Sequence, residues 1–134
     1  MFASFMRWLR IGLVYLQAAF YTFAGVMHFV SPAAYRPMMP DYLPAPDFLI
    51  LLSGVAEVVV GLGLLWPRTR AWAGWGVVAL LLAVWPANLH IALFNVPVFG
   101  AAEGAGALNW VRFVFQVPLM LLAWWSTRPV DPAG

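Results

Sequence analysis

Four ionisable His, Glu or Arg side chains stand inside apolar stretches of this sequence. Three of them lie on helix faces with other polar residues, and their presence needs a reason. They are His28, Glu57 and Arg112. An ionisable group at membrane depth costs about 2.5 to 3.5 kcal/mol on insertion scales, so one that persists usually faces a partner or a ligand. An imidazole, a carboxylate and a guanidinium together provide hydrogen bonding, charge pairing and proton transfer. These residues are the first candidates for a functional site.

Polar and small residues accompany them at helical spacing. Steps of three and four residues place such side chains along one face of a helix. The sets are Gln17, Tyr21, Gly25 and His28; Ser53, Glu57 and Gly61, with Gly54 alongside; and Asn109, Arg112 and Gln116. Small residues allow close helix approach and polar ones avoid lipid by meeting one another, so we expect these stripes to face inward.

The elements that must position these residues are four apolar stretches. The chain is 64% hydrophobic and 9% charged, whereas roughly a quarter of residues are charged in soluble domains. Stretches of about 20 apolar residues, enough to cross a bilayer core of about 30 Å, occur at 11–30, 48–66, 71–94 and 108–126. We predict an all-α, transmembrane four-helix bundle, a single membrane domain over residues 1–134 with outer loops at 31–47 and 95–107.

The distribution of arginines predicts the orientation of this bundle. All seven basic residues are arginines, and five of them fall on one side of the spans. These five are Arg7, Arg10, Arg68, Arg70 and Arg128. Because positively charged short loops stay in the cytoplasm, we expect both termini there. The arginines are scattered, so no nucleic-acid partner is expected, and the absence of cysteine excludes disulfides and thiolate metal sites.

Prolines mark where backbone groups become free. Pro86 should free the carbonyl of Leu82, and Pro118 that of Val114, which favours a polar pocket nearby. With a rise of about 1.5 Å per residue, Glu57 lies close to the midplane. Side chains lean toward the N-terminus of their helix, so four of them can converge in the outer half of the bundle. These are His28, Glu57, Asn88 and Arg112.

The convergence leaves three interpretations open. Glu57 and Arg112 can form a structural ion pair. They can instead hold the polar head of an apolar ligand beneath the 31–47 loop, which contains five prolines, or Glu57 can transfer protons. Haem ligation by two histidines is not expected, because His90 lies about 200° around the helix from Asn88. No cluster of His and carboxylates has metal-ligand spacing, so no metal is expected.

The sequence resembles the DoxX-like family of small bacterial four-span membrane proteins. The resemblance rests on AGVMHFVSPAAYRPMMPDYLP (24–44), SGVAEVVVGLGLLWPRTR (53–70), PANLH (86–90) and WVRFVFQ (110–116). Similar proteins are associated with quinone-linked thiosulfate oxidation or with resistance to quinones and oxidative stress. The resemblance implies a characteristic polar set of His28, Pro32, Tyr35, Pro40, Glu57, Pro86, Asn88, Arg112 and Gln116.

We therefore expect a protein of the bacterial inner membrane that binds a quinone-like or lipid-like molecule in the outer half of the bundle. Its expected ligand-binding residues are His28, Tyr35, Glu57, Asn88, Arg112 and Gln116, with Met38, Met39 and Tyr42 as a lid. The alternatives are a quinone-linked oxidoreductase subunit, in which Glu57 or His28 carries protons, and a structural or transport partner of a membrane complex. A quinone is the expected cofactor, if any; partner subunits or a homo-oligomer remain open, and the isolated chain is not expected to be an enzyme.

Overall fold

The structure is a computed structural model, and residues 1–129 of it are described. Its long helices are α1 (Phe2–Val30), α3 (Pro46–Gly63), α4 (Arg70–Phe94) and α5 (Ala107–Thr127), and α2 (Pro32–Tyr35) and the 3-10 helix η1 (Arg36–Met38) lie between the first two. The four long helices are each long and apolar enough to cross a membrane. The described chain contains no strand, which confirms the all-helical prediction, although α1 begins earlier and α3 ends earlier than the predicted spans.

Local sequence explains where the helices begin and end. Pro46 occupies the first turn of α3, where its missing N–H costs nothing, and Asp47 follows at the positive end of the helix dipole. Asn95 ends α4 in the left-handed conformation, with a φ of 49°. Its Oδ1 accepts hydrogen bonds from Gly106 N at 2.8 Å and from Asn109 Nδ2 at 3.2 Å. Asn95 therefore ties the 95–106 loop to the start of α5.

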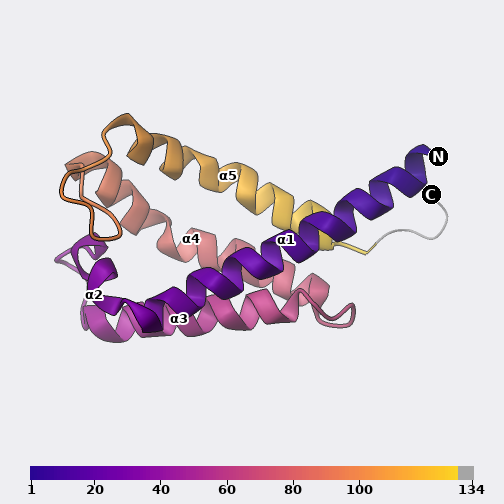
Figure 1. The fold of residues 1–134 in the computed structure, drawn as a ribbon, viewed down its shortest axis with the longest axis horizontal. Helices are drawn as coiled ribbons and strands as arrows, with labels where there is room; N and C mark the ends of the chain where they lie inside the picture. The colour runs from indigo at the N-terminus through magenta and orange to yellow at the C-terminus, as the bar shows by residue number, and fades with distance from the viewer. Residues whose placement is uncertain (130–134) are drawn as a thin grey trace.

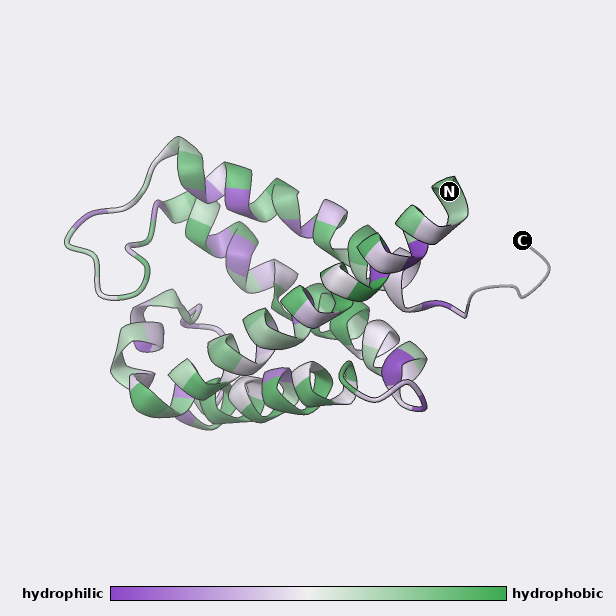
Figure 2. Cartoon of the chain, turned by 45° about the vertical axis from the view of Figure 1, so that its right-hand side comes forward, coloured by the Kyte–Doolittle hydropathy of each residue, from purple (hydrophilic) through white to green (hydrophobic). Residues whose placement is uncertain are grey.

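The helices pack as two pairs, α1 with α3 and α4 with α5 (Figure 1). The pairs meet at the end of the bundle that carries the start of α1 and the end of α5, and they diverge toward α2 (Figure 1). The buried core lies at the meeting end and includes Val14, Ala18, Leu64, Val77 and Ala123. Figure 2 shows that hydrophobic residues predominate along the long helices, and many of the large ones are exposed, which gives a surface suited to lipid.

Glycines bring α1 and α3 into direct contact. A Cβ added to Gly25 would lie 2.7 Å from the carbonyl oxygen of Gly54, and one added to Gly54 would lie 2.7 Å from Cβ of His28. Gly25 and Gly54 are both buried, as are Gln17 and Tyr21 on the same face of α1. The predicted inward stripes on α1 and α3 are confirmed, and the small residues serve close packing.

This contact can be tested by adding one methyl group. Gly25→Ala should lower the apparent melting temperature of the detergent-purified protein, because the methyl must push apart two backbones, and overpacking of this kind costs about 1 to 3 kcal/mol. Gly12→Ala is the matched control on the same helix, since a Cβ at Gly12 meets nothing within 4 Å. Tryptophan fluorescence follows the melting of both variants. Equal melting temperatures would contradict the close α1–α3 contact.

Candidate functional site

A cavity of about 600 Å³ lies between the two helix pairs, where they diverge. All four long helices, α2 and the 95–106 loop contribute to its wall. The wall is mainly apolar, and it includes Leu16, Phe20 and Phe115, each of which is more than half exposed. Since these three lie on α1 and α5, the cavity opens sideways between those two helices.

Most of the predicted site residues line this cavity. They are His28, Tyr35, Met38, Met39, Glu57, Asn88, Arg112 and Gln116. Tyr42 does not line the cavity; it is 67% exposed, and its ring lies edge-on to that of His90 with centroids 6.2 Å apart. His90 also lies outside the cavity wall, whereas Asn88 is buried within it, as the helical periodicity predicts.

His28 and Glu57 form an ion pair across the α1–α3 contact, with Nε2 and Oε2 separated by 2.9 Å. The other ring nitrogen of His28, Nδ1, lies 2.9 Å from the carbonyl oxygen of Ile50. A carbonyl only accepts, so Nδ1 must carry a hydrogen. The Nε2–Oε2 contact is attractive when a further proton lies on the imidazole or on the carboxyl group. With that proton the pair is electrically neutral as a whole.

An ion pair between Glu57 and Arg112, one of the three interpretations that the sequence left open, does not form. Glu57 belongs to the α1–α3 pair of helices and meets His28, whereas Arg112 lies across the cavity on α5. Among residues 1–129 no carboxylate pairs with Arg112, and its guanidinium lies over the ring of Phe99 at 5.1 Å. Helical spacing gave the correct faces for these side chains, but the choice of partner depends on which helices pack together.

Aromatic rings close the end of the cavity nearest α2. Tyr35 stacks on His28 with centroids 4.0 Å apart, and Phe99 meets Tyr35 edge-on at 5.5 Å. Phe99 was missed by the sequence analysis, which assigned the lid to the loop before α3. Its backbone has a φ of 53°, which is unusual for a residue other than glycine. The only sequence signal was an aromatic residue beside Gly100 in a loop.

The Tyr35 hydroxyl is held in its protonated form. Burial raises the pKa of Tyr35 above its ordinary value, the charge of Glu57 adds to the rise, and Arg112 opposes it. The ordinary tyrosine pKa is already about 10. The phenol therefore remains a hydrogen-bond donor throughout the physiological range of pH.

Four enclosed polar atoms of residues that line the cavity meet no partner at hydrogen-bond geometry, and one of them, Glu57 Oε2, faces His28 Nε2 in the ion pair. Gln17 and Gln116 are only 5% and 4% exposed. Their amide nitrogens are bonded, Gln17 Nε2 to Ser126 Oγ at 2.9 Å and Gln116 Nε2 to Leu81 O at 3.4 Å. Their Oε1 atoms are not, and neither is Nη1 of Arg112. Buried polar groups normally have partners. These two acceptors and one donor are covered by protein, and a small turn of each side chain would bring them to an occupant of the cavity.

Side chains bridge α4 and α5 beside the two internal prolines. Trp85 Nε1 donates to Phe113 O at 3.2 Å, and Gln116 reaches Leu81 O. Phe113 O lies one residue before the Val114 carbonyl that Pro118 was predicted to free. Leu81 O likewise lies one residue before the Leu82 carbonyl that Pro86 was predicted to free. The bridges hold α4 against α5 at the level of the cavity, and thereby fix Gln116 in its wall.

The proton shared by His28 and Glu57 can be observed directly. In a His90→Gln background His28 is the single histidine, since the chain has two. We expect the ¹⁵N spectrum of labelled protein to show Nδ1 protonated and Nε2 sharing a proton. In Glu57→Gln, Nε2 should become an unprotonated acceptor while Nδ1 stays protonated by its bond to Ile50 O. An unprotonated Nδ1 in either protein would contradict the assigned geometry.

Comparison with known proteins gives one match. No curated protein and no solved structure matches the chain. Nothing in the comparisons links it to the DoxX-like family, so that resemblance stays an expectation. The family described as "Domain of unknown function (DUF8561)" matches residues 17–127, a range that includes the whole cavity wall except Leu16. The chain belongs to this family.

Proposed function

We propose that the protein binds a lipophilic small molecule with a quinone-like head in the cavity between its helix pairs. The observation that carries this proposal is the set of enclosed atoms without a protein partner, Arg112 Nη1, Gln17 Oε1 and Gln116 Oε1, in the wall of a largely apolar cavity. A volume of about 600 Å³ lies within the range of about 300 to 1,000 Å³ that is usual for small-molecule sites.

The polar groups match a ring that carries oxygens. Arg112 and the protonated Tyr35 donate hydrogen bonds, which the carbonyl oxygens of a quinone accept. Gln17 and Gln116 offer acceptors, which the hydroxyl groups of a quinol need. The site therefore suits both forms of one molecule. The apolar remainder of the wall suits the ring faces and an attached hydrocarbon tail.

The sideways opening supports a ligand taken from the bilayer. Leu16 and Phe20 on α1 and Phe115 on α5 line the cavity and face outward, into the region that lipid tails would occupy. A molecule dissolved in the bilayer could enter between α1 and α5 without crossing water. Its tail could remain among the lipids while the head reaches Arg112.

A second candidate function rests on the His28–Glu57 pair. An imidazole nitrogen and a carboxyl oxygen 2.9 Å apart, next to a cavity that fits a quinone, would suit a subunit that moves protons to or from a bound quinone. In this role the chain would work with a redox partner, and Glu57 and His28 would carry the proton. Quinone turnover distinguishes the two functions, because a protein that only binds the quinone does not contribute to its turnover.

Binding of decylubiquinone tests the proposed site. We expect quenching of tryptophan fluorescence in detergent-purified protein, with an affinity that falls about tenfold or more in Arg112→Gln, because a hydrogen bond to a charged group contributes about 1.5 to 3 kcal/mol. Gln116→Leu should weaken the binding of decylubiquinol more than that of decylubiquinone, because Gln116 Oε1 can accept a hydrogen bond from a quinol hydroxyl group. His90→Gln is the matched control outside the cavity.

Two further outcomes complete this test. Decylbenzene, which has a tail and a ring but no oxygens, should bind weakly and equally to all variants; tight binding that ignores Arg112 would refute a polar site. For the second candidate, Glu57→Gln in intact membranes should abolish quinone turnover while leaving decylubiquinone affinity within about twofold. Membranes that show no turnover dependent on this protein leave binding as its function.

We further propose that the protein lies in the bacterial inner membrane as an accessory of redox or stress metabolism, with both termini in the cytoplasm. The support is the concentration of arginines at the end of the bundle that carries the termini. Alkaline phosphatase fused after Thr127 should be inactive and a fluorescent protein fused there should be bright. The opposite pair of signals would reverse the orientation.

A further inference from the structure

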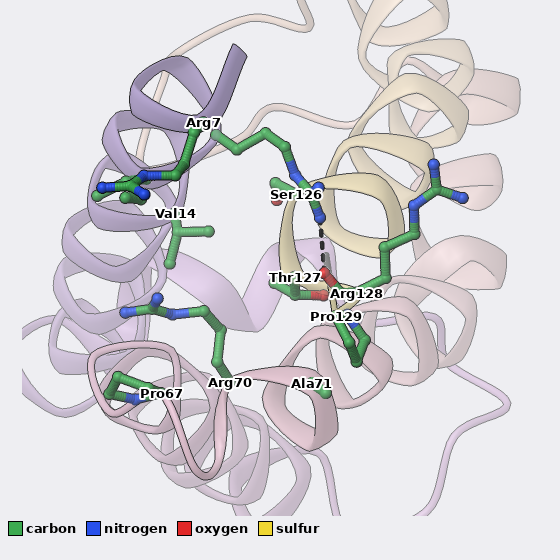
Figure 3. A pocket seen from close by; sticks show the side chains of 11 residues that line it. Arg7, Val14, Pro67, Arg70, Ala71, Ser126, Thr127, Arg128 and Pro129 are labelled. Atoms are coloured by element: carbon green, nitrogen blue, oxygen red, sulfur yellow. Dashed lines mark hydrogen bonds between the residues drawn. The ribbon is translucent and has the colours of Figure 1, made fainter. Parts of the chain in front are cut away.

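A second cavity, of about 320 Å³, lies at the opposite end of the molecule from α2. The start of α1, the start of α4 and the end of α5 surround it (Figure 3). Four of its eleven lining residues are arginines. They are Arg7, Arg10, Arg70 and Arg128. The remainder of the wall is largely apolar and includes Ile11, Val14 and Ala71.

These four positive charges have no counter-charge in the described chain. No acidic residue lines the cavity. The carboxylates in residues 1–129 belong to Asp41, Asp47, Glu57 and Glu103, and these precede or begin α3, face the other cavity, or lie in the 95–106 loop. Like charges held together in this way repel one another, so an anion in the cavity would be strongly favoured.

Two of the arginines are fixed by the fold. Arg10 Nη2 donates to Trp125 O at 2.9 Å and to Arg128 O at 2.6 Å, at the end of α5. Arg70 donates to Leu64 O at 2.9 Å, just beyond the end of α3. Both guanidinium groups have further N–H donors that these bonds do not use, and the enclosed Nε of Arg10 has no partner. Figure 3 shows Arg70 reaching toward α1, where its guanidinium lies 5.8 Å from the ring of Tyr15.

The other two arginines are free to move. Arg7 and Arg128 are exposed, and Figure 3 shows their side chains directed to opposite sides of the cavity. Each lies over a tryptophan, Arg7 over Trp8 at 5.4 Å and Arg128 over Trp124 at 4.7 Å. Because neither guanidinium is held by a carbonyl, both can turn toward an anion without breaking the fold.

We propose that this cavity binds the phosphate group of an anionic phospholipid. Exposed tryptophans at this end, including Trp8, Trp66 and Trp124, mark the level at which a bilayer surface would lie. A cavity at that level, with guanidinium donors and apolar walls, is suited to a phosphate head with acyl chains beside the helices. Arg10 and Arg70 form the fixed part of the site and Arg7 and Arg128 close over it.

Native mass spectrometry with two lipids tests the site. Detergent-purified protein is offered equal amounts of phosphatidylglycerol and phosphatidylcholine, and wild type should retain one phosphatidylglycerol in clear preference. The double variant Arg7→Gln/Arg128→Gln should lose at least about tenfold of that preference, because each arginine near an anionic lipid contributes about a factor of five. Its melting temperature should stay unchanged, since it breaks no hydrogen bond of the fold.

Arg68→Gln is the matched control. Arg68 is exposed in the same turn as Arg70, but it does not line the cavity. Retention of the preference in this variant supports a defined site, whereas an equal loss would show diffuse surface charge and overturn the proposal. Inorganic phosphate at millimolar concentration separates the two sources of the anion. If phosphate fails to displace the lipid, the result supports a site for a lipid headgroup. If phosphate displaces the lipid, the cavity is a site for soluble phosphate and the lipid proposal is overturned.

Discussion

The contact between Gly25 and Gly54 determines which polar side chains meet inside the bundle. It brings the backbones of α1 and α3 so close that a Cβ on either glycine would collide with the other helix. His28, one turn from Gly25, is thereby pressed against α3, where Ile50 O holds one ring nitrogen and Glu57 meets the other. An acid and a base that share one proton are neutral together, which reduces the cost of placing both at membrane depth.

The second pair of helices is held differently, and the difference produces the cavity. Trp85 and Gln116 bridge α4 and α5 beside the internal prolines, and Asn95 ties the loop to α5. The two pairs share small core residues at one end, but at the other end bulky side chains such as Tyr35, Met38 and Phe99 lie between them. The space that remains is closed by aromatic rings at the end nearest α2, and its wall includes two glutamines whose Oε1 atoms have no partner.

The helices and their inward faces were predictable, because lipid forces polar residues at helical spacing toward neighbouring helices. Most of the candidate wall, including Asn88 and Gln116, followed from this rule. The partner of Glu57 did not, since α1 packs on α3 through glycines and leaves Arg112 across the cavity. Phe99 could not be anticipated either, because its position depends on a left-handed backbone in a loop, for which an aromatic residue gives no signal.

The protonation of His28 and Glu57 also determines the charge of the cavity. When the pair holds the second proton it is neutral, and Arg112 is then the one uncompensated charge among the described residues of the wall. A positive charge in surroundings of low dielectric acts strongly on whatever lies beside it. Under the proposed function, Arg112 would favour the electron-rich oxygens of a quinone over an apolar head. It would stabilise a negatively charged reduced form more than the neutral one, so an occupant should be easier to reduce here than in lipid.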